Sequence, residues 1–325
     1  MSALDFDGMY ARAKKAAKAS KPSLPNTTLS VGFLRDIGGV PKTLQFANHC
    51  LTEGDANEVL SNIWRLNGWI HAGGRNVMIM GGVPHPNGAI LEQLPPWLLK
   101  LARQLSPIFN GKTPNQVLIN EYVDFQGIAE HCDGPLYHSQ AAIVSFESSA
   151  LVKFRLSDLS VLQSHFSTAH ADNKDGVDNV SDLGFEAAVE AKQLSKCCSE
   201  QILELLGESN LLPCSSVLEY PENFSVMLPP RSLLVFNDIC YEKYVHAIDA
   251  VESDIIDDTC VNANLCDVTI GQIVPRCRKR YSLTFRIVKT VAYIIDEFGP
   301  CTTELREEIN RRKVWWSKAI SEDNI

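Results

Sequence analysis

The sequence predicts an α+β fold with a mainly β core: a double-stranded β-helix (jelly roll) with flanking N-terminal helices and a C-terminal helix. Two observations support this prediction. Before residue 110, apolar residues recur at helical spacing, whereas from residue 115 onward they alternate with period two. The alternating segments are short, numerous and separated by turn residues. Many short strands after an early helical region are typical of a closed or layered β fold with helices on one side.

Residues 1–30 are small, basic and proline-containing. Five basic residues lie in an Ala-rich run that predicts a short helix ending before Pro22: Arg12, Lys14, Lys15, Lys18 and Lys21. A solvated tail or surface helix is the first interpretation of this run. A basic arm that contacts phosphate is the alternative.

Two helices are predicted next. Residues 52–67 form the first, because Thr52 is a suitable N-cap and Gly68 follows its end. The second begins at Leu94-Pro95-Pro96, with proline at its favoured first-turn position. Between them, residues 69–75 predict a Gly-rich loop or hairpin, and residues 81–88 an irregular connection.

Seven segments then alternate as strands do. They are residues 116–124, 140–147, 150–156, 215–219, 224–228, 232–237 and 279–289. Two insertions interrupt them: the polar, partly helical residues 157–214 and an acidic loop at residues 249–270. We therefore predict an N-terminal extension and helix (1–68), a core (69–290) with these two insertions, and an amphipathic C-terminal helix (291–325).

Composition restricts the class of protein. The formal net charge is −9 and the sequence pI about 5.4, which argues against a surface that binds nucleic acid over its whole area. No apolar run approaches the length of a membrane span, and the N-terminus does not have the pattern of a signal peptide. We expect no membrane association, reduced cysteines, a cytoplasmic and/or nuclear location, and a monomer.

The candidate metal ligands begin with His131-Cys132-Asp133. Positions two apart on an extended backbone point the same way, so His131 and Asp133 could bind one cation. His246 is the candidate third ligand. Two histidines and one carboxylate on one face of an octahedral ion leave three positions open, as in Fe(II) enzymes that bind an oxoacid and O2. By itself the His-x-Asp pattern is weak, since the chain has eight histidines.

The segment from Arg280 to Arg286 alternates cleanly. Its apolar residues share one face, and Arg280, Ser282, Thr284 and Arg286 share the other. The two guanidinium groups could hold the two ends of a small dicarboxylate, because each matches a carboxylate in a bidentate pair. A strand of a surface sheet would show the same alternation.

Together, several motifs resemble the AlkB-type Fe(II)- and 2-oxoglutarate-dependent dioxygenases, most closely the sixth AlkB homolog subgroup. The motifs are Asn120-x-Tyr122, His131-x-Asp133-Gly134-Pro135-Leu136-Tyr137, Pro230-Arg231-Ser232, His246 and Arg280-x-Ser282-Leu283-Thr284-x-Arg286, with Gly81-Gly82-Val83-Pro84-His85-Pro86 and Leu94-Pro95-Pro96-Trp97 supporting the subgroup. The resemblance runs from about Trp69 to Val288.

The resemblance implies a role for each matching residue. His131, Asp133 and His246 would bind Fe(2+). Arg280 would pair with the distal carboxylate of 2-oxoglutarate and Arg286 with its iron-chelating end, while Asn120, Tyr122 and Ser282 would complete the cosubstrate site. Trp69 to Met80 would form part of a substrate-covering lid, with Arg75 a candidate phosphate or base contact and Tyr137 a candidate substrate contact.

The activity that the resemblance implies is oxidative demethylation of alkylated nucleobases in RNA or DNA, with O2 and 2-oxoglutarate consumed. Two departures concern the substrate: Pro135 stands where several members carry an acid, and Met80 replaces a lid aromatic. Two alternatives therefore stay open. One is a 2-oxoglutarate-dependent hydroxylase or demethylase of a protein or small substrate. The other is a nucleic-acid-binding module with weak catalysis.

Overall fold

The computed structural model describes residues 27–38, 43–85, 87–157 and 221–294, together with residues 307 and 311. All described helices and strands belong to one compact unit, which comprises residues 1–157 and 222–325. Several predictions fall outside the described residues: the basic N-terminal run, nearly all of the insertion 157–214, and the strand at residues 215–219.

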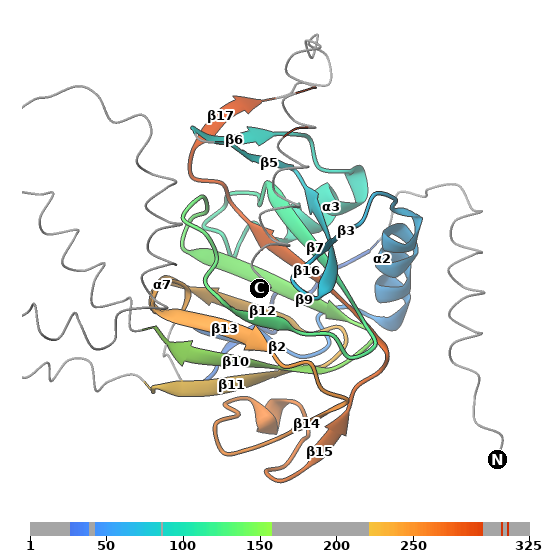
Figure 1. Ribbon diagram of the computed structural model, residues 1–325, viewed down its shortest axis with the longest axis vertical. Coiled ribbons are helices and arrows are strands. Elements are labelled where there is room, and N and C mark those ends of the chain that lie inside the picture. The colour runs from blue at the N-terminus through green and yellow to red at the C-terminus, as the bar shows by residue number, and fades with distance from the viewer. Residues whose placement is uncertain are drawn as a thin grey trace, which may run out of the picture. The chain divides into compact units, whose positions relative to one another are not determined.

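The fold is the predicted jelly roll, with two antiparallel sheets as its main layers (Figure 1). The major sheet has eight strands, in the order β1 (Arg35–Asp36), β2 (Leu44–Ala47), β12 (Leu233–Asn237), β9 (Gln140–Phe146), β16 (Lys279–Arg286), β7 (Gln116–Val123), β4 (Arg75–Met80) and β3 (Ile70–Ala72). The minor sheet has four, in the order β11 (Asn223–Leu228), β10 (Ala150–Leu156), β13 (Tyr244–Ile248) and β8 (Ile128–His131).

Two helices cover one face of the major sheet, α2 (Glu53–Arg65) and α3 (Pro96–Leu105) (Figure 1). The Thr52 hydroxyl accepts a hydrogen bond from the backbone N–H of Asp55, so the predicted N-cap is confirmed. The apolar faces of both helices pack on alternate residues of β16, namely Tyr281, Leu283 and Phe285. The other face of β16 is thereby left for the space between the two sheets.

The strand predictions are largely confirmed, and the errors have local causes. The predicted loop or hairpin at residues 69–75 is the hairpin of β3 and β4, which turns at Gly73-Gly74. Residues 81–88 are not irregular: they contain β5 (Gly82–His85) and the start of β6 (Gly88–Leu91). Gly82 has φ +129°, and a Cβ there would lie 2.1 Å from the Ile90 carbonyl oxygen. The glycines thus permit close pairing, where the sequence suggested a break.

The C-terminal prediction needs a correction at its start. Residues 291–294 are not helical but form the strand β17 (Val291–Ile294), which pairs in parallel with β6. All four residues of this segment, Val291-Ala292-Tyr293-Ile294, are apolar and so fit either period, and pairing with the edge of β6 decides for the strand. Of the rest of the predicted helix, only Glu307 and Arg311 are described, both with helical backbone.

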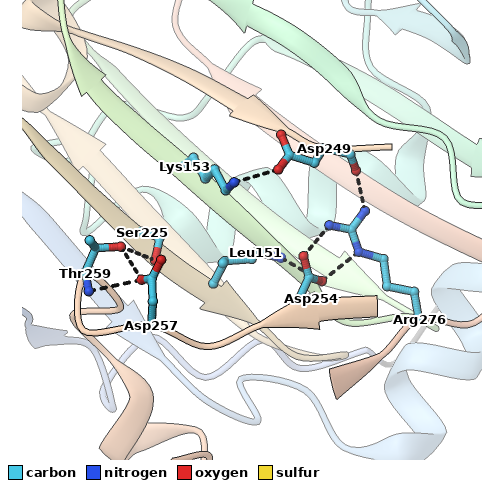
Figure 2. Close-up of polar contacts among 8 residues, drawn as sticks. All are labelled: Leu151, Lys153, Ser225, Asp249, Asp254, Asp257, Thr259 and Arg276. Atoms are coloured by element: carbon cyan, nitrogen blue, oxygen red, sulfur yellow. Dashed lines mark hydrogen bonds and ion pairs between the residues drawn. The ribbon is translucent and has the colours of Figure 1, made fainter. Parts of the chain in front are cut away.

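Residues 249–276 are more ordered than the predicted acidic loop. They contain β14 (Ser253–Ile255), a 3-10 helix at Ala263–Leu265 and β15 (Ile273–Pro275). Figure 2 shows the reason: the Asp254 carboxylate pairs with the Arg276 guanidinium at 2.6 and 2.5 Å and accepts the backbone N–H of Leu151 on β10. The acid that suggested a solvated loop is a buried structural contact.

No helix in the described part of the chain is long and apolar enough to span a membrane.

Candidate active site between the two sheets

The three candidate metal ligands converge between the sheets. His131 ends β8, and His246 lies directly opposite it on β13, with the two ring centroids 4.3 Å apart. Asp133 follows two residues after the strand. The ligand atoms of the three side chains all lie within 4.8 Å of one another.

The protein holds these groups in the protonation states that a metal requires. Burial, assisted by His131 and opposed by the Asp133 carboxylate, lowers the pKa of His246 to about 3, and burial is also the main cause of the lowered pKa of His131. Both imidazoles are therefore neutral near pH 7. Burial alone would raise the pKa of Asp133, but Arg286 and the two histidines outweigh it and keep the pKa below its usual value.

Arg286 donates a hydrogen bond to the Asp133 carboxylate and forms a buried ion pair with it. The Arg286 guanidinium also stacks over the Tyr137 ring, 4.9 Å from its centroid. Asp133 thus has one oxygen bound to arginine, while its Oδ2 is buried without a hydrogen-bond partner among the described residues. An oriented carboxylate with one free oxygen next to two neutral imidazoles fits an Fe(II) site.

His131 and His246 line a cavity of about 40 Å³ between the sheets. The polar face of β16 contributes Arg280, Ser282, Thr284 and Arg286, as the alternation predicted. Asn120 and Tyr122 on β7 also line the cavity. Apart from Arg75, the rest of the wall is aliphatic and comprises Leu118, Ile128, Ile143, Val152, Leu228 and Ile248.

Arg280 lies at the far end of the cavity from the Arg286–Asp133 pair. Its Nη2 donates to the Ser145 hydroxyl at 3.0 Å, and its guanidinium lies 5.1 Å from the centroid of the Tyr122 ring. Its Nε and Nη1 are buried without hydrogen-bond partners among the described residues. A carboxylate can accept two parallel hydrogen bonds from two N–H groups of one guanidinium, so these two nitrogens could bind one carboxylate. The cavity therefore fits a dicarboxylate with one end at Arg280 and the other near the triad.

Arg75 was predicted to contact a phosphate or a base from a lid, and the structure places its side chain inside the cavity instead. Its side chain is 7% exposed and lines the cavity, where its Nε donates to the Asn120 amide oxygen at 2.8 Å. A phosphate on the surface could not reach this guanidinium. β4 pairs directly with β7, so its pocket-facing side chain is drawn into the core rather than into a lid.

Trp69 was predicted to lie in the lid, but the structure packs it into the protein core. Its ring packs 6.5 Å from the ring of Tyr281, within the cluster between the major sheet and the helices. Because Tyr281 and Arg280 alternate across the sheet, Trp69 lies on the face away from the cavity. Of the other two predicted substrate residues, Tyr137 is buried against Arg286, whereas Pro135 is exposed in the loop after Asp133.

Sequence reasoning missed Ser145, whose hydroxyl accepts a hydrogen bond from Nη2 of Arg280. Ser145 and Ile143 share the cavity-facing side of β9, and this alternation was visible in the sequence. Cys132, between the two candidate ligands His131 and Asp133, is exposed. The chain leaves β8 at His131, so strand alternation no longer buries its neighbour.

Comparison with known proteins gives a family match over the same region. The family model described as "2OG-Fe(II) oxygenase superfamily" matches residues 68–286. This range contains the triad and both arginines of β16.

One curated relative is the zebrafish (Danio rerio) "Probable RNA/DNA demethylase ALKBH6". It is 27% identical over 255 residues, which cover 77% of this chain and 88% of the relative. Similar solved structures include that of OsALKBH1, with TM-score 0.41 and 13% identity, covering 77% of this chain and 99% of that one. A Pseudomonas putida prolyl-4-hydroxylase has TM-score 0.35 and 11% identity, covering 75% and 92%.

Proposed function

The chain belongs to the 2OG-Fe(II) oxygenase superfamily, and we propose that it oxidatively removes N-alkyl groups from nucleobases of RNA or DNA. It is a 2-oxoglutarate-dependent dioxygenase of the AlkB type, and its cofactors are Fe(2+), 2-oxoglutarate and O2. The observation that carries the proposal is one cavity lined both by two members of the His131–Asp133–His246 cluster, the histidines, and by Arg280, whose Nε and Nη1 are buried without hydrogen-bond partners among the described residues.

We assign the three clustered side chains as iron ligands and Arg280 as the partner of the distal carboxylate of 2-oxoglutarate. When bound, the iron supplies the oxidation: 2-oxoglutarate becomes succinate and CO2, one atom of O2 enters succinate and the other the alkyl carbon, and the hydroxylated group leaves as an aldehyde. Arg286 keeps Asp133 ionised and oriented throughout.

The aliphatic wall has its own part in this chemistry. Six aliphatic side chains surround the polar groups, so few waters share the cavity with the cosubstrate. Charge pairing between guanidinium and carboxylate is stronger in such a low-dielectric space than in water. The same wall keeps the oxidising centre away from bulk solvent.

The choice of substrate rests on the zebrafish relative, whose name gives RNA or DNA as what it acts on. The match covers 88% of that relative, so it extends well beyond the cosubstrate site. A base within a duplex must leave the stack before it can enter a pocket between two sheets, which favours single-stranded or flipped substrates. We place this activity in the cytoplasm, the nucleus or both.

The test uses synthetic RNA and DNA oligonucleotides that carry single N-methylated bases. The full chain is incubated with Fe(II), 2-oxoglutarate and O2, and both succinate and the restored base are measured by mass spectrometry. The proposal predicts restored base in the parent and none in His246→Ala, while the exposed His138→Ala serves as the matched histidine control.

Two outcomes separate the proposal from its alternatives. Succinate formed without any restored base, together with hydroxylation of an added protein extract, would assign the chain to protein substrates. Oligonucleotide binding without turnover of 2-oxoglutarate would identify a binding module instead.

A further inference from the structure

Arg75 is a buried cation for which the family-derived assignments give no place in the cosubstrate site. The cavity contains three guanidinium groups, those of Arg75, Arg280 and Arg286. Arg286 is neutralised by Asp133. No carboxylate of the described residues forms an ion pair with Arg75, and a buried cation without an anion is costly. Burial accordingly lowers the pKa of Arg75.

The strongest contact of Arg75 is with an amide. Its Nε lies 2.8 Å from Oδ1 of Asn120, whereas its Nη1 lies 3.5 Å from the carbonyl oxygens of Ala72 and Gly73, at the limit of a hydrogen bond. Arginine can only donate, so the group of Asn120 that faces it must be the oxygen. This contact therefore fixes which end of the Asn120 amide is nitrogen.

The nitrogen end of the Asn120 amide faces β16, the strand that carries Arg280, Ser282 and Arg286. Nδ2 of Asn120 lies 3.2 Å from Oγ of Ser282, its register partner on β16. An amide nitrogen has two N–H groups, and Ser282 accepts one of them. Three neighbouring strands thus carry a chain of contacts from Arg75 through Asn120 to Ser282, all on the cavity face.

Ser282 alone cannot hold this orientation, because a hydroxyl donates as well as it accepts. Without the N–H of Arg75, the amide could rotate by a half-turn and present its oxygen lone pairs to the cavity. An oxygen there would repel a bound carboxylate, while an N–H attracts it.

We infer that Arg75 is a positioning residue of the oxoacid site, which locks the amide of Asn120 with a hydrogen-bond donor towards the cosubstrate. The inference rests on the proposed function, because it takes 2-oxoglutarate as the ligand. The inference also gives β4 a second role in the site. This strand pairs with β7, and through Arg75 it determines that Asn120 presents an N–H group to the cavity.

A double-mutant cycle tests the inference. The affinity of 2-oxoglutarate for the Mn(II)-loaded full chain is measured by titration calorimetry for the parent, Arg75→Met, Asn120→Ala and the double variant. In the parent, Arg75→Met is expected to weaken 2-oxoglutarate binding about 10- to 100-fold. In the Asn120→Ala background, the loss of affinity caused by Arg75→Met is expected to be smaller by a factor of at least about five. Arg75→Lys, which keeps a donor, is expected to lie between the parent and Arg75→Met.

Two controls make the outcome decisive. Mn(II) affinity and the unfolding midpoint are measured for every variant, and Arg103→Met, on the exposed face of α3, is the matched arginine control. The inference is overturned by additive effects in the cycle, or by unchanged 2-oxoglutarate affinity in Arg75→Met. A parent chain that binds Mn(II) but no 2-oxoglutarate overturns the proposed function as well, so the two failures are distinguishable.

Discussion

His131 and His246 are register partners in the antiparallel pairing of β8 and β13, with a β-bulge between His246 and Ile248. Direct pairing of two strands brings the two imidazoles together without any loop. The geometry of the candidate metal site is therefore set by the backbone hydrogen bonds of the minor sheet, and Asp133 is added by the chain as it leaves β8.

His246→Ala is expected to lower Mn(II) or Fe(II) affinity by at least about 100-fold, because two ligands on one side of an ion bind far less tightly than three. Titration of the metal-free chain under anaerobic conditions measures this directly. His138→Ala should retain the affinity of the parent. Equal metal affinity in His246→Ala and the parent would exclude His246 as a ligand.

Arg280→Met is expected to reduce affinity for 2-oxoglutarate by about 30- to 1,000-fold, since it removes the guanidinium with unused donors. Metal affinity should stay within about twofold of the parent, because Arg280 contacts none of the three ligands. Calorimetric titration of the Mn(II)-loaded chain separates the two effects. A variant that loses metal rather than 2-oxoglutarate would contradict the assignment.

How far the sequence predicted this site depends on the kind of contact involved. The polar face of Arg280–Arg286 followed from period-two alternation alone, and the strand does present those side chains to the cavity. The convergence of His131 with His246 could not be derived that way. It needs the pairing of β8 with β13, which depends on the topology of the whole fold rather than on local pattern.

The positions of Arg75 and Trp69 also depend on strand pairing, and here the prediction from sequence was wrong. Both were assigned to a lid because the family resemblance implies a lid over residues 69–80. The hairpin instead joins the major sheet beside β7, which sends Arg75 into the cavity and Trp69 to the opposite face. Asp254 was misinterpreted for a related reason, since its partner Arg276 lies at the other end of the segment that it stabilises.

Two ion pairs of residues 249–276 should differ strongly in their contribution to stability (Figure 2). Asp254 and Arg276 are each 4% exposed, and Asp254→Asn leaves a buried guanidinium without its anion, at a cost of about 3–5 kcal/mol. Asp249 and Lys153 are about half exposed, so Asp249→Asn should change the free energy of unfolding by less than about 1 kcal/mol. Urea unfolding measures the free energy of unfolding of both variants, and the two can be compared directly if their m-values equal that of the parent. Similar midpoints for both variants would contradict the difference in burial.

Gly82→Ala is expected to destabilise the chain far more than Gly68→Ala, although both glycines have positive φ. At Gly82 a Cβ would lie 2.1 Å from the Ile90 carbonyl oxygen, so the β5–β6 pairing must shift. At Gly68 nothing lies within 4 Å, and only the backbone strain of about 1 kcal/mol remains. Thermal unfolding of both variants gives the comparison. A loss in Gly68→Ala as large as in Gly82→Ala would show that strain, not pairing, decides.

Pro135→Asp should change the choice of base without changing the cosubstrate site. Pro135 is exposed two residues after Asp133, where an added carboxylate would face an incoming substrate rather than the buried Arg286. A base methylated on a ring nitrogen such as N1 of adenine is a cation near neutral pH, and a nearby carboxylate attracts it. We expect the ratio of turnover on cationic to neutral methylated bases to rise about 5- to 20-fold, from ~1–2 kcal/mol of charge attraction.

Affinity for 2-oxoglutarate should match that of the parent, and Pro135→Asn is the neutral control of similar size. Equal ratios in the aspartate and asparagine variants would show that the loop after Asp133 does not contact the base.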